Sequence, residues 1–317
     1  MYAKPIYVVD GARSPFLKSK NRPGVFSAGD LATQAGRTLL ARQKFAPTEL
    51  DEVILGCAAP SVDEVNIGRV VALRMGCGQK VPGWTVMRNC ASGMQAIDSG
   101  ISNILAGRSQ LVMAGGVDAL SRAPLLYNGK MVDWFSDMAG MRSTGQRLGH
   151  FAKLPFGALL SPVIGIMKGL TDPMVGLLMG QTAENLAHRF GITRAQMDAF
   201  AARSHERVRR AESNGWLTLD HDGLSAEMAP VFDGTGKLYG TDDGVRADST
   251  PENLARLRPF FDRRYGNVTA GNSSQITDGA AWLALADEEA VARYDLKPIA
   301  RVLDTQWAGL EIGRAHV

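Results

Sequence analysis

Residues 83–96 read GWTVMRNCASGMQA, a run of β-forming residues that leads through a polar turn into a helical pattern. The turn contains Asn89 and Cys90, and small residues follow it. Over residues 91–106, apolar side chains recur at helical spacing and predict an amphipathic helix with one buried face. The stretch therefore predicts a strand, a turn and a helix, with Cys90 where the helix begins.

Cys90 stands where a nucleophile would be useful. Unpaired N–H groups and the dipole at a helix N-terminus favour a thiolate and can stabilise an oxyanion. A thiol also suits a thioester substrate, because moving an acyl group between two thiols is nearly isoenergetic. A lone cysteine is more often a small buried hydrophobic residue, which is how we interpret Cys57 and Cys77. For Cys90, position alone leaves both interpretations open.

The flanking sequence extends this pattern into an α/β fold. Short β-rich runs alternate with helical segments in the first half: strands are predicted at 6–9, 52–57, 84–88 and 110–114, and helices at 27–43 and 66–75. Between residues 121 and 258 the strand pattern fades, and the clear helical segments are 182–190 and 193–214. Strand-like segments return at 267–270 and 280–285, so the middle region is predicted to be an insertion.

The composition is that of an ordinary globular protein. The chain has 317 residues, 45% of them apolar, and its formal charge of +3 gives no broad field that would attract nucleic acid. The three cysteines are too few for a disulfide framework, and without a CxxC pair they do not predict a structural zinc site. They favour a reducing, cytoplasmic location. We expect no targeting leader and no spanning helix, because prolines interrupt the most apolar stretch, residues 154–180.

Family likeness decides the interpretation of Cys90. The sequence NCASGMQAI at residues 89–97 closely resembles the nucleophile motif of thiolases. Further matches follow in the family's order along nearly the whole chain: GARSPF at 11–16, LRPFF at 257–261, VTAGNSS at 268–274 and TDGAA at 277–281. The chain is therefore identified as a member of the thiolase family.

The resemblance implies a thiolase-like core of two similar halves in five layers, α/β/α/β/α. It implies that residues 1–120 with 259–275 form the first half, that 121–258 form an inserted loop domain, and that 276–310 begin the second half. It also implies an acyltransferase in which Cys90 takes up the acyl group as a thioester. Coenzyme A would be a substrate, with no separate cofactor.

The resemblance also suggests binding residues. Met179 would line the acyl pocket, and Leu178 stands where some acetoacetyl-specific relatives have histidine, which favours a different or broader acyl specificity. Ala270 and Ser274 would contact the pantetheine arm of CoA, although a tight turn built for packing explains each equally well. Lys237, in the glycine-rich turn at 234–240, is a candidate for the CoA phosphates. A solvated basic helix face is the commoner explanation for the neighbouring arginines, which are Arg203, Arg207, Arg209 and Arg210.

Within the family, the chain most resembles the thiolase β-subunit of the fatty-acid oxidation complex. The cues are RSTGQRL at 142–148, RSH at 203–205 and the long apolar insertion before Met179. This implies a homodimer or tetramer and a hydratase/dehydrogenase α-subunit as partner. Residues 154–180 would then dock on lipid or on a partner, or pack in the core; both interpretations stay open.

Two catalytic motifs of the family do not occur in the sequence. None of the five histidines (His150, His188, His205, His221 and His316) is followed by proline, and no second cysteine lies in a glycine-rich C-terminal motif. Residues 311–317 match nothing in the family and are predicted to be a non-native tail on a truncated second half. The resemblance implies a 3-ketoacyl-CoA or acetoacetyl-CoA thiolase, which carries out thiolytic cleavage of a 3-ketoacyl-CoA or the reverse Claisen condensation to acetoacetyl-CoA. Because both motifs are missing, we expect this chain to perform at most self-acylation of Cys90. The alternatives are a non-catalytic remnant of the fold, or a carrier-type thiolase or ketosynthase relative.

Overall fold

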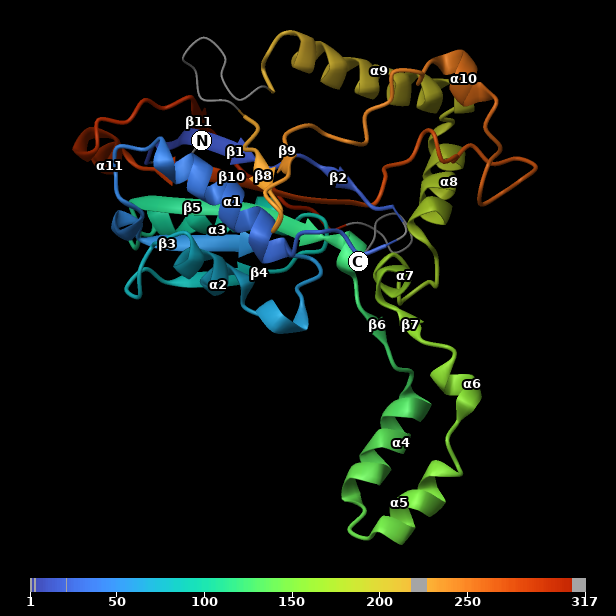
Figure 1. The fold of residues 1–317 in the computed structure, drawn as a ribbon. Coiled ribbons are helices and arrows are strands. Elements are labelled where there is room, and N and C mark those ends of the chain that lie inside the picture. Colours follow the sequence, from blue (N-terminus) through green and yellow to red (C-terminus); the bar gives the residue numbers. More distant parts are fainter. Residues whose placement is uncertain (1, 3, 21, 218–226, 310–317) are drawn as a thin grey trace.

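The computed structural model describes residues 2, 4–20, 22–217 and 227–309, and its main element is a seven-stranded mixed sheet (Figure 1). The strand order is β11-β1-β10-β5-β3-β4, and β2 pairs with the start of β10. The strands are β1 (Ile6–Arg13), β2 (Leu17–Lys18), β3 (Glu52–Gly56), β4 (Gly83–Val86), β5 (Leu111–Ala119), β10 (Thr277–Ala286) and β11 (Ala300–Val302). The predicted α/β class is confirmed.

Strand direction brings the ends of several strands together at one edge of this sheet. Strands β3, β4 and β5 are parallel, so their carboxyl ends lie at the same edge. Strand β10 runs antiparallel to β5, with Asp278 opposite Ala119 and Ala286 opposite Leu111. The amino end of β10 therefore lies beside the carboxyl ends of the three parallel strands.

Helices cover both faces of the sheet. On one face α1 (Ala28–Ala41) and α2 (Ile67–Arg74) bury Leu31, Leu39 and Val71 in the larger core, where Trp282 of β10 donates its indole N–H to the Ala32 carbonyl. On the other face α3 (Ser92–Leu105) buries its apolar stripe against β3 and β5; the stripe includes Ala96, Ile101 and Ile104. The described residues thus supply one α/β/α sandwich.

Most predicted elements are present, and one is wrong. The predicted helices 27–43, 66–75 and 91–106 correspond to α1, α2 and α3, and the predicted helices 182–190 and 193–214 correspond to α8 (Met179–Phe190) and α9 (Arg194–Ser213). Residues 267–270, predicted as a strand, form a loop. The reason is that the N–H groups of Asn267 and Val268 donate to the carboxylate of Glu184 rather than to a neighbouring strand.

The middle region contains an arm that projects away from the sheet (Figure 1). The arm consists of α4 (Gly129–Gly140), α5 (Thr144–Phe151) and α6 (Phe156–Leu159), and it joins the body through the ribbon of β6 (Leu125–Leu126) and β7 (Val163–Ile164). Trp134 stacks on His150 at 5.1 Å between ring centroids and joins α4 to α5. In the apolar stretch 154–180, Phe156 is 67% exposed and Leu160 79% exposed, so neither packs in a core.

The rest of this region returns to the sheet. Helix α7 (Gly165–Gly169) precedes α8, and three short elements follow α9: β8 (Val231–Phe232), β9 (Leu238–Tyr239) and α10 (Pro251–Ala255). Outside this region, α11 (Glu288–Arg293) follows strand β10. Arg13 of β1 holds Asp242 through two hydrogen bonds of 2.9 Å. The predicted tail at 311–317, His221 and His316 lie outside the described residues. None of the helices in the described ranges combines the length with the apolar character that a membrane span requires.

Candidate active site

A tight turn presents Cys90 to solvent. Asn89 has a φ of 45°, in the left-handed region that asparagine tolerates better than most residues. The Ser92 hydroxyl donates to the Asn89 carbonyl at 2.6 Å and accepts from the Arg88 N–H at 2.8 Å. Helix α3 begins at Ser92, two residues after Cys90, and the cysteine is exposed. The turn thus exposes the thiol beside the N-terminus of a helix.

Glycines let this turn lie directly on the sheet. A Cβ atom on Gly56, the last residue of β3, would lie 2.5 Å from the Gly93 nitrogen. A Cβ atom on Gly116 of β5 would lie 2.9 Å from the Gly93 Cα. Backbone therefore packs on backbone at the carboxyl ends of two parallel strands, and this contact fixes the height of the turn above the sheet.

The other two cysteines are buried, as predicted. Burial, aided by the nearby charge of Asp118, raises the pKa of the Cys57 thiol to about 12. Burial likewise raises the pKa of the Cys77 thiol to about 11. Both thiols are therefore protonated at neutral pH, and both are shielded from reagents in solvent.

A cavity of about 430 Å³ opens near the same edge of the sheet. Its lining comes from helix α9, from residues 271–275 and from a loop beside Phe16, and the polar groups in it include Ser204, His205, Asp242 and Ser274. Thr277 of β10 also lines it, four residues before Ala281, which pairs with Gly116. At ~3.3 Å per residue, roughly 13 Å of strand β10 separates Thr277, in the cavity lining, from Ala281, whose partner Gly116 packs against Gly93 next to the Cys90 turn.

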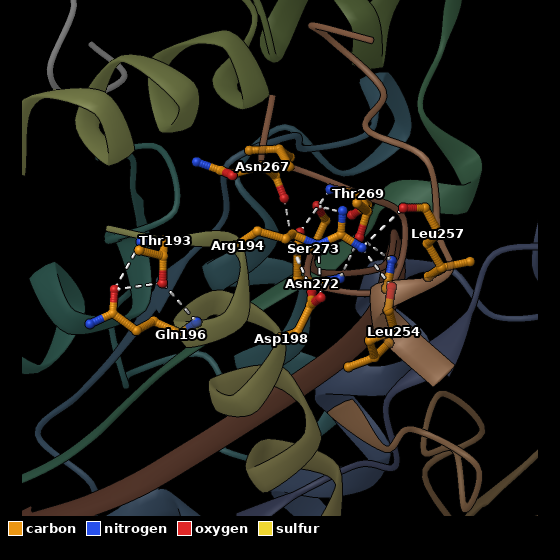
Figure 2. Close-up of polar contacts among 12 residues, drawn as sticks. Thr193, Arg194, Gln196, Asp198, Leu254, Leu257, Asn267, Thr269, Asn272 and Ser273 are labelled. Atoms are coloured by element: carbon orange, nitrogen blue, oxygen red, sulfur yellow. Dashed lines mark hydrogen bonds and ion pairs between the residues drawn. The ribbon is translucent and has the colours of Figure 1, made fainter. Parts of the chain in front are cut away.

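Two carboxylates hold the loop that forms the cavity wall. Glu184 of α8 accepts from the N–H groups of Asn267 and Val268 at 2.8 and 2.9 Å. Asp198 of α9 is buried and accepts from the Asn272 amide at 2.9 Å, and the same amide donates to the Asn267 carbonyl (Figure 2). The conformation of residues 267–275 therefore depends on α8 and α9.

Asp198 is itself held by a cation. Arg194 donates to it at 2.7 Å and to the carbonyls of Leu254 and Leu257 at 2.6 and 3.0 Å (Figure 2). A buried carboxylate with both a cation and an amide donor is well compensated for its loss of hydration. The arrangement joins α9, α10 and the cavity loop into one polar unit.

His205 contributes an imidazole to the cavity. Its Nδ1 accepts from the backbone N–H of Arg246 at 3.2 Å, so the neutral ring carries its proton on Nε2. Burial and the positive charge of Arg246 lower the pKa of His205, and the carboxylate of Asp248 opposes part of that effect. The neutral ring offers a hydrogen-bond donor rather than a charge.

The structure brings together only some of the predicted binding residues. Ser274 lines the cavity, whereas Met179, Ala270 and Lys237 are not part of its lining within the described chain. Met179 is the first residue of α8 and is 40% exposed, and the ring of Phe261 packs against the next residue, Gly180. Lys237 is exposed, with its ammonium group 5.0 Å from the centre of the Tyr239 ring.

Four arginines of α9 agree with the interpretation as a solvated helix face, because all four are exposed: Arg203, Arg207, Arg209 and Arg210.

Several residues of the site were not predicted from sequence. The cavity residue Asp242 and the two carboxylates that hold the loop, Glu184 and Asp198, gave no local signal. His205 was noted only as part of the family cue RSH at 203–205. Asp198, four residues after Arg194, has the spacing of an ordinary surface ion pair, and nothing nearby in sequence shows that it is buried.

Comparisons with known proteins agree with this arrangement. A family model described as "Thiolase, N-terminal domain" matches residues 6–289. A 3-ketoacyl-CoA thiolase of Yersinia enterocolitica is 32% identical over 307 residues, which cover 97% of this chain and 68% of that protein. A 3-ketoacyl-CoA thiolase of Serratia proteamaculans is 31% identical with the same coverage.

Solved structures show the same fold. Human mitochondrial 3-ketoacyl-CoA thiolase in complex with CoA has a TM-score of 0.77 and 30% identity, covering 94% of this chain and 68% of that one. The Bacillus anthracis acetyl-CoA acetyltransferase has a TM-score of 0.81 and 30% identity, covering 98% of this chain and 72% of that one. The predicted thiolase-like fold is therefore confirmed.

Proposed function

The chain belongs to the thiolase family of acyltransferases, and on that premise we propose that it transfers an acyl group from an acyl-CoA thioester to Cys90. The observation that carries the proposal is that Cys90 is the exposed cysteine, while Cys57 and Cys77 are buried. The turn at Asn89 and the backbone contact with Gly56 support a nucleophile held in one orientation.

The transfer is a single exchange of thioesters. The Cys90 sulfur attacks the carbonyl carbon of the acyl-CoA and forms a new C–S bond. The bond between that carbon and the CoA sulfur then breaks, and CoA leaves as a thiol with the proton that Cys90 has lost. Negative charge that develops on the carbonyl oxygen is stabilised by the adjacent N-terminus of α3.

We assign the cavity beside α9 to the pantetheine arm of CoA. Its volume, the Ser274 hydroxyl and the neutral imidazole of His205 suit a chain of amides and methylenes. It lies at the edge of the sheet that also carries the Cys90 turn. Met179 then remains a proposed acyl-pocket residue, Ala270 a second pantetheine contact and Lys237 a contact to the CoA phosphates.

The acyl transfer to Cys90 is proposed to be one step of thiolytic cleavage of a 3-ketoacyl-CoA, or of the reverse condensation to acetoacetyl-CoA, in fatty-acid oxidation. Because the sequence lacks the family's His-Pro motif and its second catalytic cysteine, self-acylation of Cys90 is the part of that reaction proposed for this chain. Relatives that carry the name 3-ketoacyl-CoA thiolase support this choice. Assembly as a homodimer or tetramer, and pairing with a hydratase/dehydrogenase subunit, belong to the same proposal. The projecting arm, with Phe156 and Leu160 exposed, would be a surface for such a partner or for peripheral contact with lipid.

Intact mass spectrometry after addition of acetyl-CoA or a longer acyl-CoA tests the first step. We expect one acyl adduct on the wild-type chain and on a Cys57→Ala control, and none on Cys90→Ala. An adduct that persists in Cys90→Ala would show that another residue carries the acyl group. No adduct on any variant would favour a non-catalytic member of the fold.

A further inference from the structure

We propose that residues 304–307 form a strap that positions the Cys90 turn, with Trp307 and Asp98 as its positioning residues. The inference rests on the proposed role of Cys90 as nucleophile. The strap follows β11, the strand that pairs with β1 at one border of the sheet. Beyond β11, the chain crosses to α3, the helix that begins just after Cys90.

Asp98 of α3 holds the strap at two points. Its Oδ2 accepts from the indole N–H of Trp307 at 3.0 Å, and its Oδ1 accepts from the Thr305 hydroxyl at 2.5 Å. The Thr305 hydroxyl has one proton, so the Tyr2 hydroxyl 2.6 Å away must be the donor in their contact. Bonds to a carboxylate are stronger than those between neutral groups, and both oxygens of Asp98 are used.

Trp307 carries this restraint on to the turn. The guanidinium carbon of Arg88 lies 4.0 Å from the centre of the Trp307 ring, which is within range for a cation–π contact. Arg88 also belongs to the turn itself, because its carbonyl accepts from the Ala91 N–H at 3.0 Å and its N–H donates to the Ser92 hydroxyl. One residue therefore joins the strap to the backbone that flanks Cys90.

The turn needs such a restraint because it is open to solvent. Residues 87–90 are all exposed, and their contact with the sheet is made through Ser92 and Gly93 on the helix side. On the strand side, the ladder of β4 ends at Val86, whose carbonyl accepts from the Cys57 N–H at 3.1 Å, and beyond it the stacking of Arg88 on Trp307 limits the motion of the turn. A nucleophile held in one orientation reacts faster than one that samples several.

Rates of acyl-Cys90 formation in the full chain test this role. We expect Trp307→Ala to lower the maximal rate about two- to fivefold, the range of an exposed cation–π contact, and to leave the half-saturating acyl-CoA concentration unchanged. Trp307→Phe keeps the ring face and should recover part of the rate. Asp98→Leu should resemble Trp307→Ala, because leucine has a similar size and shape but accepts from neither the indole N–H nor the Thr305 hydroxyl. Trp216→Phe, which alters another exposed tryptophan, is the matched control.

A second readout does not depend on the acyl-transfer reaction. Alkylation of Cys90 with iodoacetamide should change the tryptophan fluorescence of the wild type and of Trp216→Phe, and this change should be lost in Trp307→Phe. An undiminished change in Trp307→Phe, or an unaltered acylation rate in Trp307→Ala, overturns the proposal. If Cys90 takes no acyl group from acyl-CoA in any variant, the proposed function fails, and the alkylation experiment alone decides whether the strap is coupled to the turn.

Discussion

A Cβ atom on Gly56 would lie 2.2 Å from the carbonyl carbon of Ser92, so strand β3 and the first turn of α3 meet backbone to backbone. No side chain other than hydrogen fits between them without displacement of one element. The position of the Cys90 turn is therefore set by the absence of a side chain at the end of a buried strand.

Gly56→Ala should displace this turn. Because the obstacle is backbone rather than a flexible side chain, we expect the free energy of unfolding to fall by about 1–3 kcal/mol and the rate of Cys90 alkylation to change with it. Urea denaturation and iodoacetamide kinetics measure the two effects. The matched control is Gly149→Ala in α5, where an added Cβ would meet nothing within 4 Å. This variant should raise the free energy of unfolding by about 0.5–1 kcal/mol, because alanine loses less backbone entropy than glycine on folding. Equal behaviour of the two variants would contradict the packing argument.

Only one cysteine should react in the folded chain. Burial raises the pKa of Cys57 to about 12 and that of Cys77 to about 11, so neither offers a thiolate or an accessible sulfur at pH 7.5. Mass spectrometry after brief iodoacetamide treatment should show a single label, located on Cys90 by peptide mapping. Three labels should appear in urea. Rapid labelling of Cys57 in the native chain would mean that the packing around the end of β3 opens in solution and exposes this thiol.

Asp198→Ala should damage the cavity and leave the nucleophile intact. The change leaves Arg194 and the Asn272 amide without their buried partner, at a cost of about 3 kcal/mol. Binding of CoA, measured by calorimetry, should weaken, while Cys90 alkylation proceeds at the wild-type rate. Asp295→Ala removes a solvent-exposed partner of Lys44 and should change neither. A parallel loss of alkylation would show that the two sites are not separable.

The parts predicted from sequence are those determined by local pattern. The helical stripe after Cys90 and the strand before it are continuous in sequence, and both are present as α3 and β4. Strand β5 extends to Ala119, beyond the predicted end at residue 114, and the two residues that follow that predicted end are Gly115 and Gly116. They are glycines required by packing, since a Cβ on Gly115 would lie 2.2 Å from the Ala281 carbonyl oxygen.

The parts that sequence did not reveal depend on partners far along the chain. The loop at 267–270 is held by Glu184, 83 residues before Asn267, so no local pattern predicts its shape. Asp242 reaches the cavity because Arg13, 229 residues earlier, binds it. The roles of Met179, Ala270 and Lys237 and the boundaries of the loop domain stay predictions, since they come from family likeness rather than from contacts in this chain.

His205 should make stability depend on pH in the mildly acidic range. Its pKa in the fold lies below the ordinary 6.5, because burial and Arg246 disfavour the imidazolium. The unfolded chain therefore binds more protons as the pH falls through 6.5, and the stability present above that pH is lost toward the lower pKa of the folded state. His205→Asn keeps an acceptor near Nδ1 for the Arg246 N–H but does not titrate. Unfolding free energies in urea at pH 7.5 and 5.5 should differ less for this variant than for wild type, with His188→Asn on the exposed surface of α8 as control. An identical pH dependence in wild type and His205→Asn would show that the ring is solvated in both states, and the cavity would then not hold it neutral.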